Sequence, residues 1–369
     1  MLDKVDTKKL TAGLIVLTFL VIAFGGLIRV SDAGESCPDW PTCFGTWGFD
    51  ISPEEQESWW NENPDEIDSR GEHHRYTTFE IFTEWFHRLL AGAILGPLVI
   101  LNWLIVRRNE ESSRNTIFAS NLSLGLIIWQ GTLGWLTVKI DNVHWSVALH
   151  LSSALAFILS LTWLWICINR DEGNQPSWFE FDPVLASKWK SRIAWLGVGT
   201  FTTVFAGVFV ATTPGADQIC GISGDLNSWP LCNGNYISEI VDLENQSQII
   251  HRWLVAIVGG ILLLACWFVS KEQIQHQHGL ILRNWIWAAT ALYCLNIAIG
   301  ALYILSWAPE NETFREMLSL VHLLIGSTSF LTLATAWLAI SAFALYEPCL
   351  LYTSPSPRDI SGSRMPSSA

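Results

Sequence analysis

Charged side chains are scarce in this sequence. Asp, Glu, Lys and Arg together make up 15% of the 369 residues, whereas 50% of the residues are hydrophobic. This composition argues against an ordinary soluble globular protein of this size. A charge at the centre of a bilayer costs roughly 2.5–3.5 kcal/mol on insertion scales, so long stretches without charge indicate a membrane protein instead.

Basic residues are in particularly short supply. The chain has 21 Lys and Arg against 34 Asp and Glu, and its formal net charge is −13. This balance argues against a nucleic-acid-binding protein, which needs a basic footprint. The acidic residues gather in two segments: Ser31–Thr83 holds 13 acidic and 2 basic residues, and Thr212–Gln248 holds 5 acidic and no basic residues. We interpret both segments as solvated loops outside the membrane.

The N-terminal segment lacks the marks of a cleavable signal. Lys4, Lys8 and Lys9 precede the first apolar run, but this run is long and no A-x-A cleavage motif follows it. We therefore expect a retained first helix. The segment also lacks the Arg- and Ser-rich composition of a transit peptide, which favours the plasma (inner) membrane of a prokaryote.

Uncharged runs of at least 18 residues occur eight times in the chain. A helix needs about 20 residues to cross a hydrocarbon core of ~30 Å, so each run predicts one transmembrane helix. The runs are Thr11–Ile28, Leu89–Val106, Asn115–Val138, Val143–Asn169, Ile193–Ala216, Trp253–Ser270, Asn284–Pro309 and Met317–Tyr346. The expected fold class is therefore an all-α integral membrane protein with eight transmembrane helices.

The positive-inside rule orients these helices, because cytoplasmic loops carry an excess of Lys and Arg. With a cytoplasmic N-terminus, 12 basic residues lie inside and 4 lie outside. The inside residues are Lys4, Lys8, Lys9, Arg107, Arg108, Arg114, Arg170, Lys188, Lys190, Arg192, Lys271 and Arg283. The outside residues are Arg70, Arg75, Lys139 and Arg315. We therefore expect the N-terminus in the cytoplasm.

An ordered set of motifs occurs twice along the chain. The first set is Gly25-Gly26, Cys37-Pro-Asp-Trp-Pro-Thr-Cys43, His87-Arg88 and His150. The second set is Gly207, Cys220 with Trp229-Pro-Leu-Cys232, His251-Arg252 and His322. We interpret this repeat as two tandem, pseudo-symmetric four-helix bundles related by an axis along the membrane normal. The expected division is an N-terminal half (1–169), a cytoplasmic linker (170–192), a C-terminal half (193–346) and a disordered, possibly non-native tail (347–369).

Each half carries two histidines on different predicted helices, at matched depth near the outer face. They are His87 and His150 in the first half and His251 and His322 in the second. Ionisable residues inside membrane helices are costly, so they indicate function. Imidazole is a good ligand for iron, and facing helices of a bundle can present one ligand to each face of a porphyrin. The pattern therefore predicts heme iron bound by His87 with His150, and by His251 with His322.

Two further residue types accompany these histidines. Arg88 and Arg252 each follow a histidine, and Arg29 ends the first helix; all three are candidates to pair with heme propionates, with interfacial snorkelling as the alternative. Glu84 lies three residues before His87, on the same helix face. Gln248 stands at the matching position of the second half. This difference predicts that one half holds a passive heme and the other performs chemistry.

Four cysteines fall in the predicted outer loops, where disulfides persist. The pairs Cys37–Cys43 and Cys220–Cys232 are plausible intraloop bridges, and a redox-active first pair is an open alternative. Cys-x-x-Cys-His is absent from the sequence, so no covalently attached c-type heme is expected.

These motifs together resemble the heme A synthase family over roughly residues 10–346. They include Glu84-Trp-Phe-His87-Arg88, the Cys37 to Cys43 loop, Gly131-Thr-Leu-Gly134 and Trp229-Pro-Leu-Cys232. The resemblance implies that the chain oxidises a methyl group of heme O to the formyl group of heme A for terminal oxidase assembly. It implies a resident heme b at His251 and His322, substrate heme O at His87 and His150, and Glu84 as the catalytic acid.

The same resemblance implies heme O, the heme O synthase and an unidentified electron acceptor as partners, with a homo-oligomer as an open possibility. Two other classes remain alternatives to an enzyme of this family. One is a membrane b-type cytochrome that only transfers electrons, which would not need Glu84. The other is an outer-face thiol–disulfide oxidoreductase, whose activity would depend on Cys37 and Cys43.

Overall fold

The protein is almost entirely helical where its structure is described. The computed structural model describes residues 5–66, 70, 74–221, 225–235, 243–273 and 278–344. Its α-helices are α1 (Thr7–Val30), α2 (Pro53–Glu62), α3 (Thr78–Arg88), α4 (Gly96–Arg108), α5 (Arg114–Lys139), α6 (His144–Asp171), α7 (Pro183–Thr212), α8 (Leu243–Lys271), α9 (His278–Leu305) and α10 (Glu312–Ala339). The tail expected at 347–369 lies outside the described residues.

Eight spans of the described chain are long and apolar enough to cross a membrane, which confirms the predicted number. The spans extend beyond the uncharged runs because local signals in the flanking sequence start the helices earlier. The clearest case is α7, which begins at Pro183 rather than at Ile193. The Asp182 side chain accepts a hydrogen bond from the Leu185 N–H, and Pro183 occupies the first helical position. Helix therefore covers much of the segment expected to be a linker.

The second span changes its winding near its middle. Between α3 and α4, Leu89–Leu95 forms a π-helical segment, so that the span runs from Thr78 to Arg108. Pro97 follows this segment and has no N–H to bond to a carbonyl one turn earlier, a known cause of irregular winding. The segment begins directly after His87 and Arg88, and π-helical turns are frequent at functional sites.

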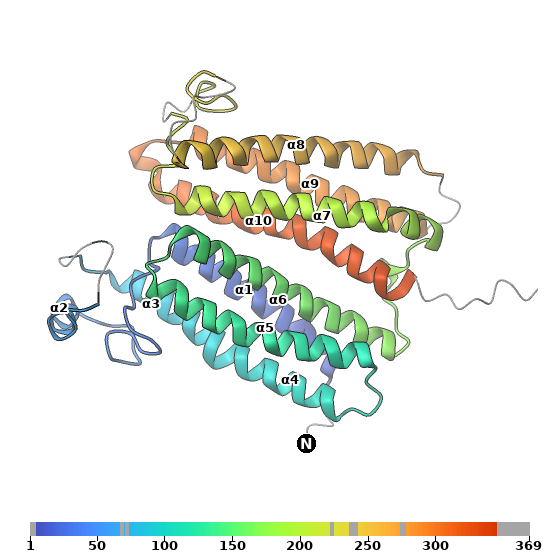
Figure 1. Cartoon of the computed structure of the whole chain (residues 1–369), viewed down its shortest axis with the longest axis horizontal. Helices are drawn as coiled ribbons and strands as arrows, with labels where there is room; N and C mark the ends of the chain where they lie inside the picture. Colours follow the sequence, from blue (N-terminus) through green and yellow to red (C-terminus); the bar gives the residue numbers. More distant parts are fainter. Residues whose placement is uncertain are drawn as a thin grey trace, which may run out of the picture.

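The helices form two neighbouring groups in the order of the sequence (Figure 1). One group contains α1, α3, α4, α5 and α6; the other contains α7, α8, α9 and α10. They meet where α1 and α6 pack against α7 and α10. Ile22, Ala154 and Leu155 are buried at this contact, beside Phe201 and Phe330. The division into two halves and their pseudo-symmetry stay predictions.

The two cysteine loops project from the same end of the molecule (Figure 1). The first loop is itself folded around α2, which Ser52 and Glu55 start with reciprocal hydrogen bonds. The buried Gln56 side chain bonds both the N–H and the carbonyl of Tyr76. Trp59 and Trp60 pack against Phe44. The loop therefore has its own small core above α3.

Candidate functional site

The four predicted ligand histidines lie on four different helices. His87 is in α3, His150 in α6, His251 in α8 and His322 in α10. All four are half-buried. Each group therefore contains two of these histidines on different helices, and their role as heme ligands stays a prediction.

Each histidine ring packs against a glycine of a neighbouring helix. A Cβ atom added to the glycine would lie 3.3 Å from Cε1 of His87 at Gly25, and 3.3 Å from Cε1 of His150 at Gly134. The C-terminal group is tighter, with 3.1 Å between Gly207 and His251 and 2.8 Å between Gly300 and His322. Small residues let membrane helices approach closely. Here the missing side chains leave room for imidazoles.

His251 and His322 face each other with ring centroids 6.4 Å apart and an interplanar angle of 78°. Two metal–imidazole bonds of about 2 Å each, together with the distance from each nitrogen to its ring centre, put the centroids of two axial ligands roughly 6 Å apart. This pair therefore fits the coordination of one heme iron. The ring of His251 also lies within hydrogen-bonding reach of the backbone of Thr203.

His87 and His150 form the corresponding pair of the N-terminal group, and they lie near enough for their charges to interact. The ring of His87 lies within hydrogen-bonding reach of the backbone of Val21, whereas the ring of His150 contacts the side-chain amide of Gln130. The two pairs therefore share their helix positions and glycine contacts but differ in what surrounds one of the rings.

Arg88 holds the first cysteine loop against α3. Its guanidinium donates to the backbone carbonyls of Cys37 at 2.7 Å, Asp39 at 2.5 Å and Thr42 at 3.0 Å. It also pairs with the Glu84 carboxylate one turn earlier. The planar guanidinium suits several acceptors at once. Arg88 thus closes the loop over the outer end of the helix that carries His87.

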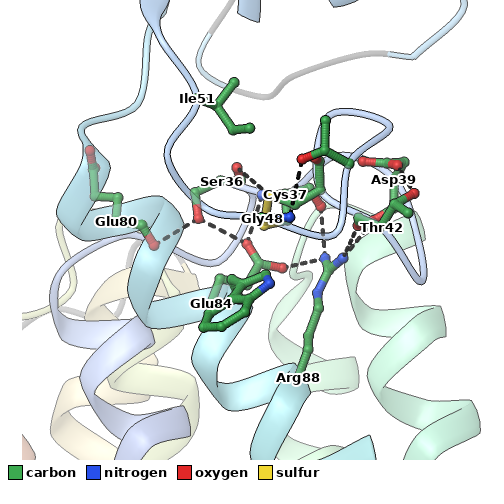
Figure 2. The surroundings of a disulfide bond; sticks show 12 residues. Ser36, Cys37, Asp39, Thr42, Gly48, Ile51, Glu80, Glu84 and Arg88 are labelled. Carbon is green, nitrogen blue, oxygen red and sulfur yellow. Dashed lines mark hydrogen bonds and ion pairs between the residues drawn. A yellow bond between two sulfur atoms is a disulfide. The ribbon is translucent and has the colours of Figure 1, made fainter. Parts of the chain in front are cut away.

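Glu84 lies beneath the same loop, only 4% exposed. One carboxylate oxygen accepts the Cys37 N–H at 2.9 Å and the Ser36 hydroxyl at 3.1 Å, and the other accepts from Arg88. Figure 2 shows Glu84 and Arg88 rising together from the helix towards the loop. A buried carboxylate needs such partners. The structure therefore gives Glu84 a role in fixing the loop.

The second cysteine loop is held by Arg252 in the same way, except that the acid is missing. Arg252 donates to the carbonyls of Ser228 at 3.0 Å and Leu231 at 2.8 Å. Relative to Cys232, these residues occupy the positions that Asp39 and Thr42 occupy relative to Cys43. Gln248 is buried where the first group has Glu84, and Nη2 of Arg252 has no partner among the residues that the structure describes.

Arg29 connects the two helix groups. It donates to the carbonyl of Ala211 in α7 and pairs with Asp32 at 2.9 Å. Arg29 and Arg88 are therefore already engaged by protein groups, and Arg252 keeps one free nitrogen. Pairing of these three arginines with propionates stays a prediction.

The structure bonds the cysteines in the expected pairs, Cys37 with Cys43 and Cys220 with Cys232. All four cysteines are buried. Beyond each bridge the chain turns in the same way: the next two residues, Phe44-Gly45 and Asn233-Gly234, have positive φ values. The glycines permit this left-handed turn, which closes each loop towards its arginine.

Two features of the site escaped the sequence analysis. Gly300 and Gln130 were not singled out, although both contact or support a predicted ligand. Their signal lies in the spacing: Gln130 precedes Gly134 by four residues, and Asn296 precedes Gly300 by the same number. The repeat therefore extends to the helices that carry no histidine at the site.

Known proteins of one kind resemble this chain. A family model described as COX15-CtaA, cytochrome oxidase assembly protein, matches residues 8–334. The heme A synthase of Flavobacterium psychrophilum is 24% identical over 359 residues, which cover 89% of this chain and 95% of that protein. The heme A synthase of Shouchella clausii is 27% identical over 255 residues, covering 68% and 72%. That of Shewanella oneidensis is 31% identical over 152 residues, covering 41% and 42%.

The close contact between Gly300 and His322 predicts that a larger residue at position 300 weakens heme binding. Gly300→Ala places a methyl group 2.8 Å from the ring, and overpacking of roughly 1–3 kcal/mol corresponds to about fivefold or more weaker heme binding. Heme content and the low-spin absorbance of purified protein measure this effect. Gly260→Ala is the control, because nothing lies within 4 Å of that position. Equal heme content in the two variants would contradict the proposed contact.

Arg88 holds the Cys37–Cys43 loop against α3, so we expect it to limit the access of reductants to the first disulfide. Arg88→Gln removes hydrogen bonds from a charged donor, each worth about 1.5–3 kcal/mol, so the loop should open more often. We expect dithiothreitol to reduce Cys37–Cys43 about tenfold faster, as followed by alkylation of the released thiols and mass spectrometry. Arg75→Gln removes the same charge from the same outer loop and should leave the rate unchanged. A slower or equal rate of reduction in Arg88→Gln would contradict the proposal that Arg88 holds the loop closed.

Proposed function

The chain belongs to the COX15-CtaA family of cytochrome oxidase assembly proteins, and we propose that it acts there as a heme A synthase whose two halves hold two different hemes. It is an enzyme, and it converts heme O into heme A within the membrane. The substrate is heme O bound between His87 and His150. The resident cofactor is heme b bound between His251 and His322.

One observation supports the proposal that the two halves have different functions. Glu84, buried and paired with Arg88, has only Gln248 as its counterpart. Several other corresponding elements recur: the histidines, the glycines beneath them and the arginine that holds a cysteine loop. A passive heme needs no buried acid beside its site. The half that has the acid is therefore the half that performs the oxidation.

The residues of the N-terminal half serve this oxidation in distinct ways. His87 and His150 hold the substrate near the outer surface. Arg88 and Glu84 keep the Cys37–Cys43 loop over the site, which limits the access of water. The Glu84 carboxylate places a negative charge where positive charge develops as the methyl carbon loses electrons. A resident heme b supplies an iron that can accept and pass on electrons.

The reaction also determines the partners. Turning a methyl group into a formyl group removes electrons and adds oxygen, so a separate electron acceptor is required. Heme O is made by another enzyme, the heme O synthase, which is the expected donor of the substrate. The distribution of Lys and Arg supports a prokaryotic plasma membrane with the N-terminus in the cytoplasm. Both cysteine loops then lie in an oxidising compartment.

Glu84 provides the direct test of the catalytic assignment. Glu84→Ala and the closer substitution Glu84→Gln should both stop heme A formation, because each removes the negative charge. The resident heme should keep its spectrum in both variants. Coexpression with a heme O producer, heme extraction and chromatography give the yield. Normal heme A from Glu84→Gln would rule out a role for the charge, and the absence of heme A from the wild type would favour the electron-transfer cytochrome.

The histidines of the C-terminal half provide a second test. His251→Ala or His322→Ala removes one axial ligand, so the low-spin b-type spectrum of the resident heme should be lost or become high-spin. His278→Ala is the control, because His278 lies on the cytoplasmic side and bonds the carbonyl of Glu180. A full low-spin spectrum in both ligand variants would exclude this pair as the resident heme's ligands.

A further inference from the structure

Arg315 is one of only four basic residues on the predicted outer side, and it lies in α10, the helix that carries His322. The two residues are seven positions apart in the sequence. Seven residues make almost two full turns, so Arg315 lies on the same helix face as His322, about 10 Å nearer the outer end. A positive charge therefore stands beyond the site at which the resident heme is proposed to bind.

Two aromatic residues at and just beyond the outer end of α9 contact the Arg315 side chain. The guanidinium carbon lies 4.8 Å from the centre of the Tyr303 ring and 5.5 Å from that of the Trp307 ring. Tyr303 follows Gly300, which contacts the His322 ring, by three residues. Residues at this spacing are neighbours on one helix face. Arg315 and His322 thus approach neighbouring turns of α9.

Two N–H groups of this cluster lack an acceptor. Asp217 accepts from Nη2 of Arg315 at 3.1 Å and from the Tyr303 hydroxyl at 2.8 Å. Nε of Arg315 and Nε1 of Trp307 are buried, and neither has a partner within the described part of the chain. Both nitrogens can only donate, and leaving buried donors unbonded is costly. The cluster therefore suits an acceptor supplied by a bound molecule.

The donors in this cluster favour a carboxylate. A guanidinium forms charge-assisted hydrogen bonds with carboxylates, and the indole N–H adds a further donor. A heme carries two propionates at one edge of the macrocycle, away from its axial ligands. Arg252 follows the other ligand, His251, and its Nη2 is also without a partner in the described residues. Each predicted ligand helix of this half therefore carries an arginine with an unused donor.

The N-terminal half lacks these donors at the corresponding positions. Val143 stands where Arg315 does, seven residues before the histidine of its helix. Asp141 stands where Trp307 does, seven residues after the glycine that contacts that histidine. An apolar side chain and an acid offer no donor to a carboxylate. The cluster therefore belongs to the half in which the heme is proposed to stay.

We propose that Arg315 and Trp307 bind a propionate of the heme held between His251 and His322. The resident heme is then anchored by a second attachment that is independent of its iron. The inference rests on the proposed function, which assigns heme b to this histidine pair. A positive charge beside the heme also favours the reduced iron, so Arg315 raises the midpoint potential of the resident heme.

The experiment follows the resident heme of the purified protein. Arg315→Met removes the charge and the donors, and Trp307→Phe removes only the N–H while keeping an aromatic ring. Each protein in detergent is mixed with excess apomyoglobin, and heme transfer is followed by absorbance. Loss of a hydrogen bond between charged groups predicts about tenfold faster transfer from Arg315→Met, with a smaller increase from Trp307→Phe. The propionate bending mode in resonance Raman spectra should shift in both variants.

Three further variants serve as controls. Arg283→Met and Trp287→Phe change the same residue types near the cytoplasmic end of α9, where Trp287 donates to the Ser270 hydroxyl at 3.2 Å. Both should keep the wild-type transfer rate and propionate mode. Asp217→Asn breaks the ion pair with Arg315 but keeps an acceptor and leaves the positive charge. Its transfer rate should not exceed that of the wild type.

The outcomes separate this proposal from the proposed function. A shifted propionate mode with faster transfer supports the proposal, and Trp307→Phe decides alone if Arg315→Met does not fold. An unshifted mode or an unchanged transfer rate in both variants overturns it, since the donors would then serve another anion, such as a lipid phosphate. Acceleration by Asp217→Asn equal to that by Arg315→Met also overturns it. If the wild type holds no b-type heme, the resident site of the proposed function fails, and this inference fails with it.

Discussion

Close packing of helices against imidazole rings is the constraint on which the rest of this structure depends. Every histidine of the two pairs has its ring against a glycine of the neighbouring helix. A larger residue at any of these positions would push the ring or the helix away. Because the lipid offers no hydrophobic gain for pressing helices together, small residues must supply the fit. The positions of the rings are therefore set by the helix contacts.

The outer loops are fixed by a second recurring device, an arginine that gathers backbone carbonyls. Arg88 and Arg252 follow the first histidine of each half and reach corresponding carbonyls of the two cysteine loops. Each loop is thus tied to the same helix that presents a ligand. The disulfide restrains the conformation of each loop, and the arginine holds the loop against its helix. The histidines and the loops are therefore built as one unit at the same end of the helices.

The two halves differ at a few positions of this shared framework. Glu84 adds a buried charge to one half, and Gln248 leaves the other half neutral at the same place. The Gln130 amide lies against the ring of His150, whereas the Asn296 carbonyl oxygen lies 2.9 Å from Nδ1 of His322. Both differences concern only a few atoms. The buried acid is the difference on which the proposed division of function rests.

The sequence by itself determined the class of protein, the eight spans and the candidate histidines, because charge is excluded from the bilayer core and any ionisable residue within a span is conspicuous. It also identified Glu84 as the feature that distinguishes the halves. Only the tertiary structure decided that Glu84 and Arg88 grip the cysteine loop, that Gly300 makes room for His322, and that Gln130 reaches His150. These contacts join residues far apart in the chain or depend on side-chain direction, and no local pattern of hydrophobicity records which atoms meet.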